Sequence, residues 1–299
     1  MKTPIFYKAF GLVIASDFPI VQLPKIEPRE PDVRIVRADL SQLTEAQRCF
    51  SGEHGCYFRG IDRCAHRVTG GNLIEVDPQE NFDLSALSVY LMGTCKGAIL
   101  YQRGLMMLHG SCITDGTHAV LLTGDSGAGK STLAAEFLRR GWKLLTDDVA
   151  LIHDPEGVPM VQASYPSQKL WRDTLERYDR PEEELHSLYL LGGREKFGVD
   201  ASRFFYDGQA RLSMVVRLLP GEEDCHLEPL DGMTKVDQLL YNTYRKELIE
   251  HHRLQPHFQR CVTLSTRIPM VAVTRVDAAD CAGSMYKLII DYLERGAEL

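Results

Sequence analysis

The sequence lacks several features that would each indicate a class of protein. None of its eight cysteines forms a CxxC pair, so neither a zinc site nor a redox motif is expected. We expect no apolar stretch long enough to span a bilayer. The opening residues, MKTPIFYKAFG, have no basic region followed by an apolar run, and they do not predict a secretory signal. No internal repeat or low-complexity segment is visible.

The charge of the chain excludes further kinds of partner. A net charge of −7 and a pI of about 5.8 give no basic footprint for nucleic acid or a membrane surface. Hydrophobic residues make up 44% and charged residues 25%, as in ordinary globular proteins. The 299 residues suffice for one large domain or two moderate ones. We expect a cytoplasmic protein with reduced cysteines and no nucleic-acid or membrane partner. Whether it forms a homo-oligomer stays open.

The chain divides into a β-rich start and an α/β remainder. Short β-rich runs separated by Gly, Pro and Asp fill residues 1–80, and HRVTGGNLIEV predicts a hairpin at its two adjacent glycines. The next segment, LSALSVYLMGTCKGAILY, predicts a helix capped by Asp83 or Ser85 and packed against the chain segment after it. We expect residues 1–80 to form a small N-terminal module and residues 81–299 to form an α/β domain with mixed strand directions.

Later elements follow from the same periodicities. Two apolar runs, LMMLHGSCI and HAVLLT, are joined through Asp115-Gly116, a strong hairpin signal. STLAAEFLRR predicts a helix that ends at Gly141. WKLLTDDVALIHD predicts a strand, an aspartate pair and a second strand. Strands are also expected at ARLSMVVRLLP, CHLEPL and PMVAVTRV, and helices at KVDQLLYNTYRKELIEHH, HFQRCVTLST and GSMYKLIIDYLERG.

A phosphate-binding loop is the clearest motif. GDSGAGKST matches G-x-x-x-x-G-K-[ST] at every fixed position, with an apolar strand before it and a helix after it. In such loops the backbone N–H groups and the helix N-terminus hold phosphate, the lysine reaches the β/γ oxygens and the Ser131 hydroxyl binds Mg²⁺. The expected nucleotide-binding residues are Gly124, Asp125, Ser126, Gly127, Ala128, Gly129, Lys130, Ser131 and Thr132.

Two acidic residues are expected beside this loop. A right-handed crossover lays WKLLT parallel to the loop strand, so Asp147 and Asp148 emerge at the same edge of the sheet as the loop. One carboxylate can hold Mg²⁺ and the other can accept a proton from an attacking hydroxyl, although a solvated turn would look the same. His109 is expected at the end of the strand antiparallel to the loop strand, where a histidine is more often a core residue.

The run from LHGSC to TDDVALI resembles the HPr kinase/phosphorylase superfamily, which combines HG or HA, G-[DE]-S-G-x-G-K-[ST] and DD in this order. The resemblance covers Asn72 to Trp171 clearly. VTGGNLIEVDP and YPSQKLW further resemble the shorter HPr-kinase-like proteins of biosynthetic gene clusters, and most closely the kinases that accompany lasso-peptide clusters and phosphorylate a serine of the precursor peptide. The resemblance implies an HPr-kinase-like P-loop kinase fold that uses ATP and Mg²⁺.

The resemblance also implies roles for individual residues. Asp147 is expected to be the general base, Asp148 a magnesium-associated acid, and His109 the residue that orients the phosphate or the base. Lys130 completes the catalytic set. Lys169 in SQKLW, with Arg194 or Lys196 in the Gly-flanked GGREKFG loop, is expected to neutralise phosphoryl charge.

Two departures from the superfamily narrow the expected reaction. The E-[IV]-R-G-x-G stretch and the Pro- and Arg-rich C-terminal signature of HPr kinase/phosphorylases do not occur here. We therefore expect neither HPr as the acceptor nor the reverse phosphorolysis. The expected function is ATP-dependent phosphorylation of a serine on a peptide or small protein. The alternatives are a small-molecule or sugar kinase on the same core and a nucleotide-binding switch that transfers nothing.

Overall fold

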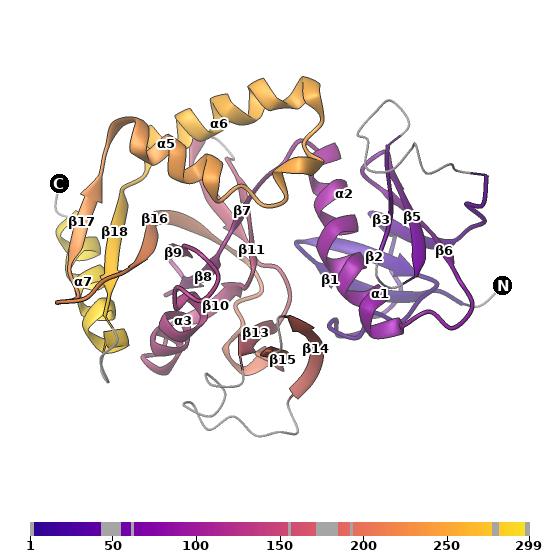
Figure 1. The fold of residues 1–299 in the computed structure, drawn as a ribbon, viewed down its shortest axis with the longest axis horizontal. Helices are drawn as coiled ribbons and strands as arrows, with labels where there is room; N and C mark the ends of the chain where they lie inside the picture. The colour runs from indigo at the N-terminus through magenta and orange to yellow at the C-terminus, as the bar shows by residue number, and fades with distance from the viewer. Residues whose placement is uncertain are drawn as a thin grey trace.

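The protein is an α/β molecule with a β-rich N-terminal part and a larger mixed sheet, connected by a pair of helices (Figure 1). The structure is a computed structural model. It describes residues 3–42, 55–60, 63–154, 157–171, 185–191, 194–276 and 281–296.

The N-terminal part is a six-stranded sheet with the order β1-β2-β3-β6-β5-β4. Its hairpins turn at residues with positive φ, including Gly70 and Gly71 at φ 61° and 65°, the conformation that a tight β-turn requires. The glycine hairpin is therefore confirmed, with Thr69 paired to Leu73. The strands are β1 (Ile5–Ala9), β2 (Leu12–Ser16), β3 (Val33–Arg37), β4 (Cys56–Arg59), β5 (Cys64–Thr69) and β6 (Leu73–Pro78).

One long helical segment covers this sheet. It comprises α1 (Leu84–Tyr90), the π-helical turn η2 (Leu91–Cys95) and α2 (Lys96–Gln102). Asp83 caps it by accepting hydrogen bonds from the next backbone N–H groups. By length and composition alone this segment could cross a membrane, contrary to the expectation from the sequence. However, 67% of its most apolar stretch is buried inside the protein. Its buried side chains share one core cluster with the N-terminal sheet and with Met107, Val149 and Tyr244.

The second part is built on a nine-stranded sheet. Its path runs β10-β8-β9-β16-β12-β11-β7, and β18 pairs with β16 and β17 beside that path. The predicted hairpin at Asp115-Gly116 is confirmed, because β8 and β9 pair antiparallel across it. The strands are β7 (Met106–His109), β8 (Ser111–Thr114), β9 (His118–Thr123), β10 (Lys143–Thr146), β11 (Val149–His153), β12 (Met160–Gln162), β16 (Gln209–Pro220), β17 (Leu227–Leu230) and β18 (Met270–Arg275).

The apolar run LMMLHGSCI is two strands rather than one. Gly110 separates β7 from β8, and the two strands have different partners: β7 pairs with β11, whereas β8 pairs with β9 and β10. His109 therefore lies at the end of a strand paired with β11, and the expectation that it ends the strand antiparallel to the loop strand is wrong. The break places His109 opposite Val149, directly after the aspartate pair.

A three-stranded sheet with the order β13-β15-β14 flanks the larger one. Its strands are β13 (Ser167–Trp171), β14 (Leu185–Leu191) and β15 (Arg194–Asp200). Arg194 and Lys196 were expected in a Gly-flanked loop, but their backbones lie in β15, where Arg194 pairs with Leu191 and Lys196 with Trp171. Their side chains lie outside the described part of the chain.

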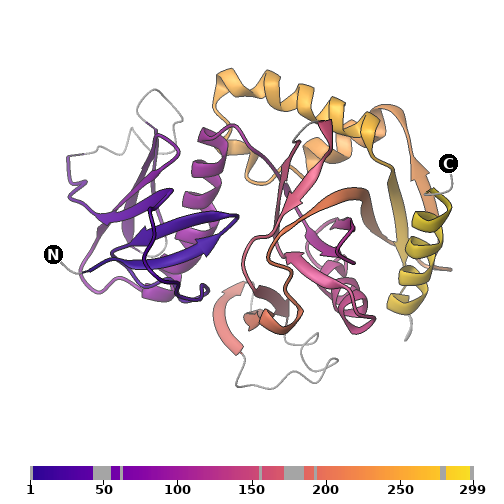
Figure 2. The same ribbon diagram turned by 180° about the vertical axis from the view of Figure 1, so that it is seen from behind.

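Helices cover both faces of the larger sheet (Figures 1 and 2). α3 (Lys130–Arg139) and α7 (Cys281–Gly296) share one core cluster with the sheet, and α5 (Gly232–Tyr241) and α6 (Leu254–Arg267) share another. The helix predicted over KVDQLLYNTYRKELIEHH ends early. After Tyr241 the chain runs beside β7, where Asn242 accepts a hydrogen bond from the His109 N–H and Tyr244 donates one to the Met107 carbonyl.

Candidate active site

The phosphate-binding loop lies at the C-terminal end of β9. Gly124, Gly127 and Gly129 have φ values of 135°, 86° and 97°, a backbone region that side chains rarely adopt. α3 begins directly afterwards at Lys130. The Lys130 Nζ atom donates to the carbonyls of Gly124 and Asp125 at 2.7 and 3.1 Å, so the lysine folds back over the loop. This arrangement fits a phosphate chain, because the glycines leave room for the backbone and the helix N-terminus faces it.

The aspartate pair forms the turn between β10 and β11 at the same edge of the sheet. β10 and β9 run parallel, since each pairs antiparallel with β8 between them. The predicted common edge for loop and acids is thus confirmed. Asp148 adopts a left-handed backbone with φ 72°, which is costly for a residue with a side chain and typical of functional sites.

The first aspartate is buried and fully hydrogen-bonded. Asp147 is 7% exposed. One carboxylate oxygen accepts a hydrogen bond from the Ser111 hydroxyl, and the other accepts one from the Lys169 backbone N–H at 2.7 Å. Asp147 therefore ties the β10–β11 turn to β8 and to β13.

The second aspartate faces two basic side chains. The Asp148 carboxylate lies 2.6 Å from Lys169 Nζ and 3.6 Å from His109 Nδ1. Burial alone would lower the pKa of Lys169, but the adjacent Asp148 carboxylate outweighs it and raises that pKa well above the ordinary lysine value. Burial lowers the pKa of His109, in spite of the opposing charge of Asp148. These shifts in pKa favour the charged form of Lys169 and the uncharged form of the His109 imidazole.

Most of the residues singled out in the sequence meet at this edge. The Ser131 hydroxyl, at the start of α3, lies 3.4 Å from the Lys169 carbonyl, so β13 connects the phosphate loop with both aspartates. The charge of Lys130 acts on the pKa of His109. His109, Lys130, Ser131, both aspartates and Lys169 therefore form one cluster. The serine hydroxyl and the two carboxylates are hard oxygen ligands of the kind that Mg²⁺ binds.

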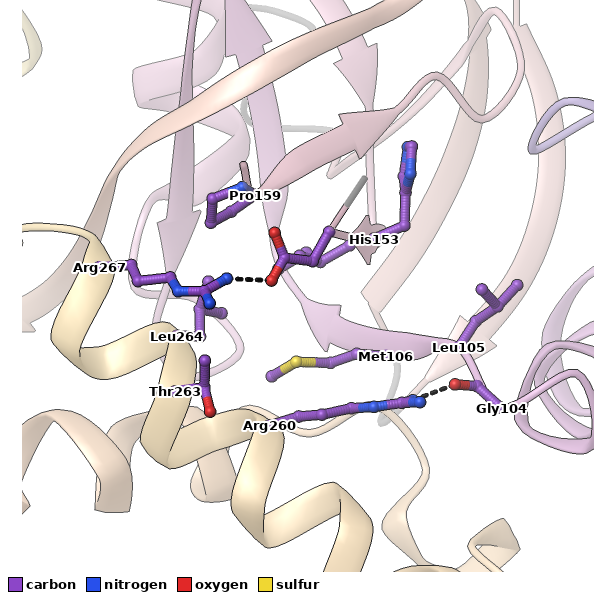
Figure 3. Close-up of a pocket in the computed structure, with 11 residues that line it drawn as sticks. Gly104, Leu105, Met106, His153, Pro159, Arg260, Thr263, Leu264 and Arg267 are labelled. Atoms are coloured by element: carbon purple, nitrogen blue, oxygen red, sulfur yellow. Dashed lines mark hydrogen bonds and ion pairs between the residues drawn. The ribbon is translucent and has the colours of Figure 1, made fainter. Parts of the chain in front are cut away.

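A cavity lies elsewhere in the molecule. It has a volume of about 300 Å³ and opens between α6 and the opposite ends of β7 and β11 (Figure 3). Met106, Arg260 and Arg267 line it, but both arginines already have partners, the Gly104 carbonyl and Asp154 respectively. Because Met106 begins β7 and His109 ends it, the cavity is separated from the phosphate loop by the length of that strand.

Comparisons with known proteins find similarity over the central part of the chain. Residues 104–249, which include the phosphate loop and both aspartates, match the family model of the HPr Serine kinase C-terminal domain. The chain is 30% identical over 141 residues to an HPr kinase/phosphorylase of Chlorobium phaeobacteroides and 44% identical over 50 residues to one of Clostridium beijerinckii. It spans only 38% of the length of the former and 17% of the latter.

A solved structure gives a further comparison. The Hpr(Ser) kinase/phosphatase of Coxiella burnetii aligns with 64% of this chain and 93% of its own, at 12% identity and a TM-score of 0.37.

Sequence reasoning missed two residues at this edge. Ser111 opens β8 and donates to Asp147. Arg275 ends β18 and lies against the phosphate loop, since a Cβ on Gly129 would be 3.3 Å from its side chain. Arg275 could have been found, because β18 is parallel to β16, which is parallel to β9, and parallel strands end at one edge. Ser111 had no such signal, because LMMLHGSCI reads as one strand.

Proposed function

We propose that the protein is an ATP-dependent kinase that transfers the γ-phosphoryl group to a serine hydroxyl of a peptide or small protein. The observation that carries the proposal is the shared edge of the sheet, where the loop with Lys130 faces the Asp148 carboxylate between His109 and Lys169. Phosphoryl transfer needs positioning, a proton acceptor and neutralisation of charge. The relation to the HPr kinase domain supports the same class of reaction.

The contacts favour a division of labour between the two aspartates. Asp148 is the more accessible acid, and its neighbours are side chains that can move. We therefore assign it the role of general base, which accepts the proton of the acceptor hydroxyl. Asp147 keeps both oxygens in fixed hydrogen bonds and holds the turn in place. These roles reverse the ones expected from the resemblance, in which Asp147 was the base. His109, neutral and beside Asp148, orients that carboxylate.

The charged residues around the turn prepare the site for phosphate. Lys130 and Lys169 stand on the two sides of the reacting group and neutralise its charge. The Ser131 hydroxyl would help to hold Mg²⁺, which neutralises phosphate charge when bound. The Ser131 hydroxyl donates to the backbone carbonyl of Lys169 at 3.4 Å, so the start of α3 and β13 are positioned together.

The acceptor is proposed from two observations. The HPr kinases to which the central segment is related act, by name, on a protein. The site also lies at an edge of the sheet, away from the cavity beside α6. Because the sequence resembles the kinases of lasso-peptide clusters, a lasso-precursor peptide with a serine is the first acceptor to test.

The test of the proposal is phosphate transfer by wild type and Lys130→Ala. Loss of a charge partner of the transition state costs about 2.7–4 kcal/mol, so transfer to a serine peptide should fall about 10²–10³-fold. Lys143→Ala, which changes an exposed lysine on β10, serves as the control. Transfer to small hydroxyl compounds alone would support the small-molecule kinase. ATP binding without formation of ADP, whichever acceptor is supplied, would support the nucleotide-binding switch and contradict the proposal.

A further inference from the structure

The segment after α5 brings two more side chains towards the active site. Residues 242–245 run antiparallel to β7, through hydrogen bonds from His109 to Asn242 and from Tyr244 to Met107. Arg245 then adopts a left-handed backbone with φ 42°. Such a conformation persists only where the surroundings impose it, and it is concentrated at functional sites. The Tyr244 carbonyl accepts a hydrogen bond from the Tyr101 hydroxyl of α2, which fixes this segment against the helix.

The ring of Tyr244 lies between two cations. The Lys96 ammonium is 5.2 Å and the Arg245 guanidinium 5.7 Å from its centroid. The ring packs beside Gly97 of the helix, where an added Cβ would be in ordinary contact with it at 3.5 Å. Lys96 also lies 4.5 Å from the centre of the Phe10 ring. Cation–π contacts of this kind stabilise a desolvated cation only in part.

Lys96 lacks an anionic partner among the described residues. It is 8% exposed, and its contacts there are the two aromatic rings rather than a carboxylate or hydrogen-bond acceptor. An uncompensated buried charge is costly. Accordingly, burial and then the positive charge of Lys169 lower the pKa of Lys96 to about 7.

The surroundings of Asp148 carry more positive than negative charge. The Asp148 carboxylate acts on the pKa values of Lys96, Lys169 and Arg245, and its ion pair at 2.6 Å is with Lys169. Arg245 lies 3.7 Å from the Glu247 carboxylate and donates a hydrogen bond to the Tyr244 hydroxyl at 3.4 Å, and its side chain is still 42% exposed. An anion that binds beside Asp148 would therefore contact the accessible guanidinium of Arg245, with the Lys96 ammonium as a second cation nearby.

We propose that Arg245 and Lys96 form a subsite for an oxyanion of the acceptor, next to the hydroxyl that receives the phosphate. This inference rests on the proposed kinase function and specifies its acceptor as one with a carboxylate or phosphate near the serine. Arg245 contacts the oxyanion, since a guanidinium binds two oxygens at once. Lys96 is a positioning residue, because its positive charge favours binding of the oxyanion without contacting it. The subsite gives the N-terminal part a role, because the Lys96 ammonium is held in place by Phe10 of that part.

The experiment compares acceptors that differ only in charge. Serine peptides are prepared with a flanking Glu or Gln, with a C-terminal carboxylate or carboxamide, and with a flanking phosphoserine or serine. For each, kcat and KM are measured with wild type, Arg245→Met and Lys96→Met, and binding is measured by calorimetry in the presence of ADP. The pairs distinguish an acidic side chain, a chain terminus and a phosphate as the source of the oxyanion.

Wild type should favour one anionic peptide over its neutral match. Arg245→Met should raise the KM for that peptide about 10-fold or more, the usual effect of losing a hydrogen bond to a charged group, and should leave the neutral peptide unchanged. Lys96→Met should act in the same direction with a smaller change. Arg211→Met, which alters an exposed arginine at the start of β16, serves as the matched control.

The outcomes separate the subsite from the kinase function. If wild type phosphorylates peptides without regard to charge, or if Arg245→Met weakens charged and neutral peptides equally, the subsite is wrong and the kinase function stands. If no peptide is phosphorylated, the proposed kinase function is wrong. The subsite is then tested by calorimetry alone. Binding of the anionic peptide that is lost in Arg245→Met would support it, and binding that is unchanged would overturn it.

Discussion

Asp147 and Asp148 are neighbours in the chain, but their environments differ. The Asp147 carboxylate is buried and receives two hydrogen bonds, one from a side chain and one from the backbone. The Asp148 carboxylate contacts the side chains of Lys169 and His109. Because fixed donors hold both of its oxygens, the Asp147 carboxylate cannot turn to an incoming hydroxyl, whereas the Asp148 carboxylate can exchange partners with the side chains around it during a reaction.

Asn variants of the two aspartates should therefore fail in different ways. In Asp148→Asn the turn keeps its shape but loses the proton acceptor, so phosphate transfer should fall about 10²–10⁴-fold, while ATP binding and the free energy of unfolding stay near wild type. The measurements are phosphate incorporation into a serine peptide, calorimetry with ATP across a magnesium titration, and urea unfolding.

Asp147→Asn should instead reduce stability. An amide has one acceptor oxygen, so if it keeps the Lys169 N–H its NH₂ group faces the Ser111 hydroxyl, which can accept from it only by giving up the hydrogen bond that it now donates, and a lost hydrogen bond costs about 0.5–1.5 kcal/mol. Normal stability with lost transfer in Asp147→Asn, together with an active Asp148→Asn, would restore Asp147 as the base, the role that the resemblance implied.

Lys96 should make stability depend on pH. Burial lowers its pKa to about 7 in the folded protein, whereas an unfolded lysine has a pKa of about 10.4. Between these values the unfolded chain binds more protons, so this lysine makes stability rise with pH. Lys96→Met removes the cost of the buried charge, and it should exceed wild type in stability at pH 6.5 by more than at pH 9. Urea unfolding across this range tests it. Parallel curves for the two proteins, like those expected for Lys143→Met, would contradict it.

The residues of the site were predictable where a short motif carries the chemistry. The loop and the aspartate pair lie in one βαβ segment, and the crossover rule brings them to one edge. Lys169 was suggested by resemblance, but its pairing with Asp148 depends on where β13 docks. Lys96 and Arg245 gave no signal, because a lysine within an apolar helix and an arginine within a helical pattern are placed only by tertiary packing.

At the scale of elements, the corner between β7 and β8 positions His109. Gly110 lies against β9, and a Cβ on it would collide with the Leu122 carbonyl oxygen. Its N–H donates to the Asp148 carbonyl at 3.2 Å, so a shift at the corner moves the aspartate turn as well. A glycine is therefore required at this position for close backbone approach.

Gly110→Ala should destabilise the protein by about 1–3 kcal/mol, the usual cost of overpacking, and should lower phosphate transfer. Urea unfolding and transfer to a serine peptide measure the two effects. Gly93→Ala is the matched control, since the same added methyl would meet its nearest neighbour at 3.8 Å and lies within a helical segment, where alanine is favoured. Equal stability of the two variants would show that the corner tolerates a side chain.

Elements that short sequence motifs specify were predicted well, whereas elements whose ends depend on packing against other parts of the fold were not. The hairpins at Gly70-Gly71 and Asp115-Gly116 are encoded in their turn residues. The helix after Gly232 was predicted too long because its later residues keep a helical pattern, whereas in the fold Asn242 and Tyr244 form hydrogen bonds with β7. Tertiary pairing overrode helix propensity there.

At the scale of the whole molecule, the α1–η2–α2 segment packs against both the N-terminal sheet and the larger part. Figure 1 shows α1 and α2 between the N-terminal sheet and the central strands. Leu87, Leu91 and Ile99 are almost fully buried in a cluster that contains Val68 and Val76 of the N-terminal sheet as well as residues of the larger part. A domain boundary at residue 80, as proposed from the sequence, would cut between this helical segment and the sheet that it covers.

A fragment of residues 81–299 should therefore not fold as a cooperative unit. Without the N-terminal sheet, the covering face of the helices would be exposed to water, and each large apolar side chain contributes about 1.5–3 kcal/mol when buried. We expect the fragment to bind a hydrophobic dye and to unfold in urea without a sharp transition. Adding residues 1–80 as a separate chain should restore cooperative unfolding, because the contacts between the two parts are noncovalent. A fragment that unfolds sharply and binds ATP by itself would instead establish residues 81–299 as an independent domain, and Lys96 would then have to reach its position without the Phe10 ring that holds it in the full chain.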